Sequence, residues 1–252
     1  MTRWDRWFPK ALVTAVLMLM PGLAAAAVGR VVTVEGTAWR TPEGAERKPL
    51  ESGAEIEQKD TLEVEPKSGV KLELNDGSVL MLSAGSQLVI TEAEFAGQER
   101  KSFSGYLKLG KVWAEVKKAL SGSEAKFEVK TDRAVAGVRG TVLRVDVATP
   151  VITGALSPST VVQVYTGLVQ VVARVPKPKD SADAGTKPGE RVEVPGPQEV
   201  TLEEWEEVVR QLQKNRQIVV GEKVGPVTGL DSKRVNDDFG AFVKRNRSLK
   251  KP

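Results

Sequence analysis

Few side chains in this chain could carry out covalent chemistry. There is no cysteine and no histidine, which excludes thiol nucleophiles, histidine relays and zinc sites with Cys or His ligands. Two carboxylates at a fixed separation could still hydrolyse a glycosidic bond, and Glu73/Asp76 and Glu92/Glu94 are candidate pairs. Because charged residues are usually solvated, we expect these pairs, among 33 acidic residues, to lie on exposed strand faces or in turns.

Serine chemistry is equally poorly supported. A hydrolase that uses lysine as its base needs a serine in a strained turn beside a desolvated lysine. Ser83, Ser86 and Lys71 form no such motif. We therefore predict a protein that is not an enzyme, with no catalytic residue, no cofactor site and no metal site.

Trp39 and Trp113 are candidates for ligand binding, because both lie in strand-like segments. A tryptophan ring that faces solvent could stack on a sugar, whereas a ring in the core would fill space with its indole N–H satisfied. Exposed rings would favour a glycan ligand, and buried rings would favour a protein partner.

Residues 127–147 are predicted to form the central part of the fold, around which the other strands are arranged. Two segments in which apolar residues alternate with polar ones, 127–131 and 141–147, predict two strands. They are joined through Gly137 and Gly140, which bracket Arg139 and precede Thr141. Arg139 could contact a partner's carboxylate or a glycan, or it could pack internally against a carboxylate of its own chain, a role that suits arginine. Thr141 is expected to be a strand residue or a local cap.

Similar alternation predicts three hairpins. They cover residues 70–82 with a tight turn at 75–78, residues 106–116 with a turn at Gly110, and residues 160–175 with a turn at Gly167. Residues 92–102 are expected to form a loop or a ragged edge. The predicted fold is mainly β, with two twisted antiparallel sheets of consecutive hairpins in a sandwich or roll. A β-solenoid-like stack is the alternative.

One amphipathic helix is predicted over residues 201–216 and is expected to pack on the sheets. Thr201 and Glu204 form a capping-box signature. An apolar stripe at helical spacing follows, formed by Leu202, Trp205, Val208, Val209 and Leu212. Residues 176–190 predict an exposed loop rich in proline and lysine. Residues 231–252 predict a basic, flexible tail with only Phe239, Phe242 and Val243 to dock it.

The first residues have the pattern of a secretory signal peptide. Arg3, Arg6 and Lys10 precede an apolar run over residues 11–20, and small residues at 24–27 offer a cleavage site after Ala26 or Ala27. An uncleaved anchor is the alternative, although the apolar run is only just long enough to span a membrane. Cleavage would remove the membrane segment and lower the formal net charge from +4 to about +2, which gives no argument for nucleic-acid binding.

The order of these motifs resembles the FecR-domain family. The quoted segments are VEGTA near the start, VKLELNDGSVLML, LKLGKVWAEV, FEVKTDRAVAGVRGTVLRV and VVQVYTGLVQVV. The most specific motif is Ala-Gly-Val-Arg-Gly-Thr at 136–141, preceded by Thr131-Asp132 where the family usually has Thr-Pro. The resemblance implies an extracytoplasmic β domain. In the family's name-giving type, this domain is the periplasmic half of a regulator that senses an outer-membrane receptor and controls a sigma factor.

Only ten residues precede the apolar run, so we expect a stand-alone exported FecR-like protein without an anti-sigma segment. The expected organisation is a signal peptide over 1–27, a FecR-like β domain over 28–195, a helix with a short strand over 196–230, and a tail over 231–252. The expected function is that of a periplasmic or exported interaction domain in cell-envelope signalling or assembly, with a protein partner. Binding of glycan or peptidoglycan is the alternative.

Overall fold

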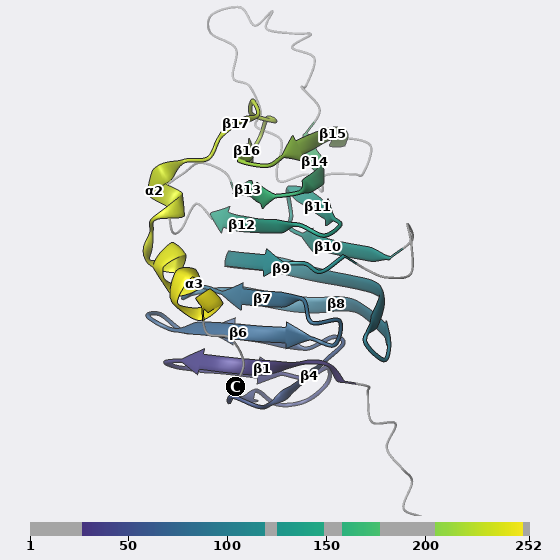
Figure 1. Cartoon of the computed structure of the whole chain (residues 1–252), viewed down its shortest axis with the longest axis vertical. Coiled ribbons are helices and arrows are strands. Elements are labelled where there is room, and N and C mark those ends of the chain that lie inside the picture. Colours follow the sequence, from purple (N-terminus) through teal and green to yellow (C-terminus); the bar gives the residue numbers. More distant parts are fainter. Residues whose placement is uncertain (1–26, 119–124, 149–157, 177–204, 249–252) are drawn as a thin grey trace, which may run out of the picture.

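The computed structural model describes residues 27–118, 125–148, 158–176 and 205–248. Within these ranges, seventeen strands form two stacked sheets, and two helices lie along the outer face of one of them (Figure 1). The predicted signal peptide lies outside the described ranges except for Ala27, and most of the predicted loop 176–190 lies outside them as well.

Sheet A contains nine strands. In spatial order they are β4 (Glu55–Glu57), β1 (Ala27–Glu35), β6 (Gly69–Leu74), β7 (Val79–Leu82), the second half of β9 (Glu99–Glu115), β12 (Val142–Ala148), β13 (Ser159–Thr166), β16 (Arg216–Val220) and β17 (Thr228–Gly229). All of these pairs are antiparallel.

Sheet B also contains nine strands, because it shares β9 with sheet A. In spatial order they are β3 (Lys48–Pro49), β2 (Ala38–Thr41), β5 (Thr61–Val64), β8 (Gln87–Ala96), the first half of β9, β10 (Lys126–Lys130), β11 (Ala134–Val138), β14 (Leu168–Pro176) and β15 (Trp205–Gln213). The pair β9–β10 is parallel and the others are antiparallel.

The prediction of a mainly β fold with two sheets is confirmed. Neither sheet closes into a barrel. The chain passes repeatedly from one sheet to the other and adds one or two strands each time, so both sheets grow along one axis from β1 towards β16 (Figure 1).

The hydrophobic core lies between the sheets. β14 shows the underlying pattern clearly, because buried and exposed residues alternate along most of its length. Phe103 of β9 and Phe127 of β10 stack in this core with ring centroids 4.8 Å apart. β12 differs, because six of its seven residues are buried. The face expected to be solvated, with Arg144 and Asp146, is instead covered by the C-terminal helices.

Two of the predicted hairpins are wrong in the same way. Residues 99–115 form the single strand β9, which passes from sheet B to sheet A at Gly110 instead of turning back. β13 and β14 do not pair with each other, because they lie in different sheets on either side of Gly167. Alternation predicts a strand, but it does not reveal whether the following glycine reverses the chain within one sheet or carries it into the other.

The residues between sheets share one backbone property. Every described connection between the two sheets contains a residue with positive φ. These residues are Gly36, Gly53, Lys59, Lys67, Gly85, Gly110, Gly140, Gly167 and Asn215. The left-handed region lets the chain bend sharply from one sheet to the next. The remaining positive-φ residues, Gly44, Gly77 and Gly97, lie in hairpin turns within one sheet.

The predicted helix over residues 201–216 is wrong where the structure describes it. Residues 205–213 form β15, which pairs with β14 along the whole of Leu168–Pro176. A nine-residue strand edge offers backbone hydrogen bonds that outweigh a weak local preference for helix, and Val208 and Val209 suit a strand. Leu202 lies outside the described residues.

A C-terminal helix is present, but at a different place. Residues 231–248, predicted as a flexible tail, contain α2 (Ser232–Val235) and α3 (Asp238–Ser248). Phe239, Phe242 and Val243 are buried, so the three residues expected to dock this segment do so.

We predict that Gly110→Ala destabilises the fold much more than Gly53→Ala. The φ values of the two glycines are +86° and +88°, so the left-handed backbone should cost both variants about 1–2 kcal/mol. A Cβ at Gly110 would also lie 2.4 Å from Ser86 Oγ, whereas nothing lies within 4 Å at Gly53. Urea unfolding followed by circular dichroism should show an additional loss of roughly 1–3 kcal/mol for Gly110→Ala. Equal losses of unfolding free energy in the two variants would contradict the steric crowding at Gly110.

Candidate functional site

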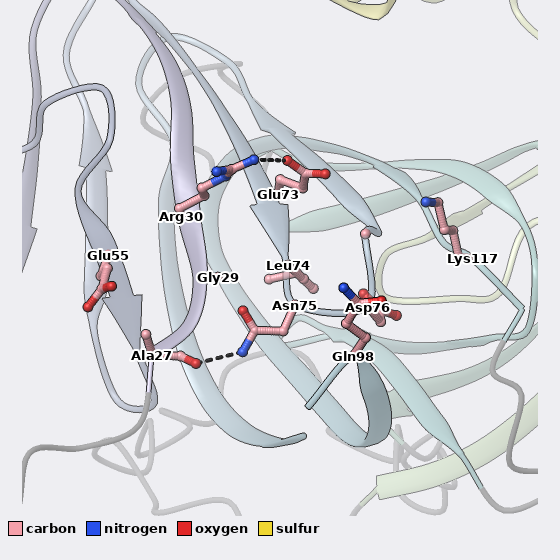
Figure 2. A pocket seen from close by; sticks show the side chains of 11 residues that line it. Ala27, Gly29, Arg30, Glu55, Glu73, Leu74, Asn75, Asp76, Gln98 and Lys117 are labelled. Carbon is pink, nitrogen blue, oxygen red and sulfur yellow. Dashed lines mark hydrogen bonds and ion pairs between the residues drawn. The ribbon is translucent and has the colours of Figure 1, made fainter. Parts of the chain in front are cut away.

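A polar groove of about 440 Å³ lies at one end of the strands, beside the start of β1 (Figure 2). Its walls come from the start of β1, from β4, from the β6–β7 turn, from the β8–β9 turn and from the segment after β9. The lining residues are Ala27, Gly29, Arg30, Glu55, Glu73, Leu74, Asn75, Asp76, Gly77, Gln98 and Lys117.

A buried arginine supports the wall formed by the β6–β7 turn. Arg100 of β9 is 1% exposed and forms an ion pair with Asp76, whose side chain is 7% exposed. Its Nη1 also donates to Ser78 Oγ at 3.1 Å, and its Nη2 donates to the carbonyl oxygen of Lys117 at 3.1 Å. Burial lowers the pKa of Arg100 while Asp76 opposes that shift, and a guanidinium keeps its charge in such a site.

The same contacts fix the turn itself. Asp76 Oδ1 accepts a hydrogen bond from Ser78 N at 2.9 Å, and Ser78 Oγ donates to Asp76 Oδ2 at 2.8 Å. Lys117 N donates to Ser78 Oγ at 3.0 Å. The predicted tight turn over residues 75–78 is therefore confirmed, and Arg100 ties it to the strand that both sheets share.

The rim of the groove presents both signs of charge. Arg30 Nη2 lies 3.0 Å from Glu73 Oε2, and Asn75 Nδ2 donates to the carbonyl oxygen of Ala27 at 2.7 Å (Figure 2). Glu55 and Lys117 are exposed and lie at opposite ends of this view. The groove therefore offers charged donors and acceptors to a ligand.

The candidate carboxylate pairs have structural roles or lie on the surface. Asp76 is engaged by Arg100 and Ser78, and Glu73 by Arg30. Glu94 is exposed on β8 and Glu92 is half-buried there. Within the described ranges, no group of three or more His, Cys, Asp or Glu residues could hold a metal ion.

The candidate serines and lysine form hydrogen bonds with each other's hydroxyls or with backbone atoms. Ser83 and Ser86 bond to each other through their hydroxyls at 2.9 Å, beside the crossing of β9. Ser86 Oγ also accepts from Lys111 N at 2.9 Å. Lys71 donates to the carbonyl oxygen of Asn246 at 2.7 Å. These contacts position the β7–β8 connection and α3.

The two candidate tryptophans do not form an exposed platform. Trp113 is 3% exposed and lies beneath α3. Trp39 of β2 is half-buried, its Nε1 donates to Glu65 at 2.9 Å, and the guanidinium of Arg47 lies 4.5 Å from its ring centroid. By the criterion of ring exposure, these positions do not favour a sugar ligand.

The motif at residues 136–141 is a corner between sheets. Gly140 has φ +62° where β11 of sheet B leads into β12 of sheet A, and Gly137 lies within β11. Thr141 is 1% exposed, and its Oγ1 lies 3.1 Å from the carbonyl oxygen of Leu168. The interpretation of Arg139 as an internally packed, paired residue is wrong, because Arg139 is exposed and forms no ion pair within the described part of the chain.

Sequence reasoning missed Arg100 because residues 92–102 were expected to form a loop. The segment is instead the β8–β9 hairpin with Gly97 in its turn. A signal was present, since Glu92, Ala93, Glu94 and Phe95 alternate between polar and apolar before this glycine. Nothing in the sequence indicated that Arg100 itself would be buried.

A second hollow of about 410 Å³ lies beside the β10–β11 turn. It is lined by Tyr106, Thr131, Asp132, Arg133, Pro158 and Arg174. Burial raises the pKa of Tyr106 to about 12, and the hydrogen bond to Asp132 acts in the same direction. Thr131 Oγ1 accepts from Ala134 N at 2.9 Å, so this turn is stabilised without the proline that the family usually has.

The fold places the chain among mainly β proteins built from two open, stacked sheets. Residues 60–170 match the model of the family described as FecR protein. The match covers the motifs from the β6–β7 turn to the corner at Gly167. In the described residues, no helix is both long and apolar enough to cross a membrane.

No curated protein matches the chain. Two crystal structures of a "putative anti-sigma factor" from Parabacteroides distasonis ATCC 8503 are similar to it, with 20% sequence identity and a TM-score of 0.43. The similarity covers 69% of this chain and 62% of theirs, so the chain spans less than two thirds of the length of those proteins.

We predict that Arg100→Ala lowers the free energy of unfolding by roughly 3–5 kcal/mol, because it leaves the Asp76 carboxylate buried without its partner. The matched control is Arg174→Ala, which breaks an ion pair with Glu207 on the surface. The side chain of Arg174 is 52% exposed and that of Glu207 is 59% exposed. That variant should lose less than about 1 kcal/mol. Chemical unfolding measures both, and similar losses would contradict a structural role for Arg100.

Proposed function

We propose that this chain is a non-catalytic, extracytoplasmic FecR-like domain that binds a protein partner in cell-envelope signalling or assembly. The polar groove of Figure 2 carries the proposal, because it is a preformed hollow with both signs of charge on its rim. The FecR domain over residues 60–170 supports a role in signalling.

The chemistry of the groove suits a polypeptide segment. Its lining contains no aromatic ring on which a sugar could stack. Arg30, Asn75, Gln98 and Lys117 can donate hydrogen bonds, and Glu55 and Glu73 can accept them. A peptide carries donors, acceptors and both charges along its length, so it can satisfy such a rim. Complementary charges across an interface favour the correct partner and register.

Binding of glycan or peptidoglycan is the second candidate. Trp39 is the observation that favours it, because its ring is only half-buried. Arg47 covers the ring, however, and Trp113 is buried elsewhere. A sugar would have to displace Arg47 from the ring of Trp39 before it could stack there. We therefore prefer a protein partner to a glycan ligand.

The proposed location outside the cytoplasm rests on the signal-peptide pattern of residues 1–27. We predict that the protein purified from an envelope fraction begins at Ala27 or Val28, as measured by intact mass and N-terminal sequencing. A substitution of Ala24 by a bulky residue should slow processing, whereas Ala54→Leu, distant from the cleavage site, should not. A mature protein that retains Met1 would support the uncleaved anchor and contradict cleavage.

We predict that the partner contacts the groove. A photo-crosslinking amino acid at Gln98, used in cells that produce the full chain, should give a discrete protein adduct that is absent when the same group replaces Lys108. Both positions are exposed, but only Gln98 lines the groove. Lys117→Glu should reduce the adduct at least fivefold because it reverses a rim charge, and Lys101→Glu provides the control.

Two results would contradict this assignment. Equal adducts at Gln98 and Lys108 would show that contact is not specific to the groove. Sedimentation of the protein with insoluble peptidoglycan, lost in Trp39→Ala but retained in Lys117→Glu, would instead support the glycan candidate.

A further inference from the structure

A second apolar cluster lies outside the sandwich, on the outer face of sheet A. Met81, Trp113 and Val142 of the sheet pack there against Phe239, Phe242 and Val243 of α3. We call residues 231–248, which contain α2 and α3, the strap. Figure 1 shows the strap running along the stack, across the strands of sheet A. Because this cluster is separate from the core between the sheets, the strap covers a sheet that is already packed on its other face.

The strap binds this face with the pattern of an amphipathic helix. Phe239, Phe242, Val243 and Asn246 are buried, at spacings of three and four residues that place them on one side of α3. The ring of Phe242 lies so close to Gly69 of β6 that a Cβ there would approach it to 2.6 Å. The side chains at 244, 245 and 247 are exposed on the other side.

Polar anchors fix both ends of α3. Asp237 accepts from Arg144 Nη2 at 2.6 Å and from Lys111 Nζ at 2.7 Å. Burial opposes ionisation of Asp237, but these hydrogen bonds outweigh it and hold the pKa of the carboxyl well below its usual range. At the other end, Lys71 Nζ donates to the carbonyl oxygen of Asn246 at 2.7 Å.

The buried arginine of the sheet face would keep an ion pair without the strap. Arg144 also forms a two-pronged pair with Asp146 of its own strand, at 2.6 Å and 2.9 Å. Removing the strap therefore leaves Arg144 paired, and the severe cost of an isolated buried charge does not arise.

The strap also leaves space on the face that it covers. A cavity of about 120 Å³ remains between the strap and the sheet, lined by Trp113, Arg144, Tyr165, Val235, Gly240, Val243, Lys244 and Arg247. Upstream, residues 221–230 contain only the two-residue strand β17 and have glycines at 221, 225 and 229. Such a connection can change direction at low cost.

We propose that the outer face of sheet A is a docking surface for an amphipathic helix of a protein partner, and that the strap is the built-in occupant which this helix displaces. The strap defines the chemistry of the partner helix. An acidic residue binds Arg144 and Lys111, and large apolar residues follow it two, five and six positions later, as Phe239, Phe242 and Val243 follow Asp237. This surface is distinct from the groove and does not depend on a ligand there.

The test uses the full chain and a fluorescein-labelled peptide with the sequence of residues 231–248. In the variant Phe239→Ala/Phe242→Ala, the strap should release the face, and fluorescence anisotropy should show the peptide binding at least tenfold more tightly than it binds to the wild-type chain. A peptide with Asp237→Lys should lose at least tenfold in affinity for the same variant. The control is Ala241→Ser in the chain, which changes the exposed side of α3 and should leave binding at the wild-type level.

Hydrogen exchange of the unmodified chain keeps the test independent of that variant. Amides of α3 should exchange at least tenfold faster than those of β9 and β12 beneath them, because the strap opens without unfolding of the sheets. Equal protection, loss of the β circular-dichroism signal in the double variant, or equal peptide binding to variant and wild type would each overturn the proposal. Concentration-dependent dimers of the variant that exclude the peptide would assign the face to a second copy and overturn the partner assignment.

Discussion

The structure depends on one strand that belongs to two sheets. β9 is the fifth of nine strands in each sheet, with β8 and β10 beside its first half and β7 and β12 beside its second. The passage of β9 from one sheet to the other needs glycine at position 110, because the backbone there has φ +86° and Ser86 leaves no room for a Cβ. Ser86 Oγ also accepts a hydrogen bond from Lys111 N at this point. The crossing at Gly110 therefore acts together with the other connections between the sheets to set their spacing. β9 contributes Arg100 behind the groove and Trp113 to the face under the strap.

Two buried arginines mark those surfaces. Arg100, on the first half of β9, fixes the turn that walls the groove, and Arg144, paired across to Trp113 of the second half, lies at the centre of the face under the strap. Each arginine is neutralised by an aspartate, and each also binds a backbone carbonyl, from Lys117 and Arg234 respectively. A guanidinium can organise several segments at once because its donors form a rigid, planar fork. In both places it joins strands to a segment that is not part of the sheet ladders.

The sequence predicted what depends on local pattern. Alternation indicated the strands, Asn75 to Ser78 indicated a tight turn, and the order of motifs indicated the FecR domain. Properties that depend on distant partners were not accessible. The segment at 205–213 has helical spacing but forms β15 because β14 offers a free edge, and Gly110 and Gly167 look like hairpin turns although they lead into the other sheet. The burial of Arg100 and Arg144 is likewise a consequence of tertiary packing, which single residues do not signal.

The strap also has a consequence for the order in which the chain folds. Most strands pair with neighbours close in sequence, so the two sheets can assemble progressively from short loop closures. The contact between Asn246 and Glu35, at 2.8 Å, instead spans 211 positions and brings the last helix back to the first strand. The entropy of loop closure grows only slowly with length, but α3 needs a formed sheet on which to dock. During synthesis, the strands from β1 to β16 can therefore pair before the residues that fasten the two ends of the stack have been made.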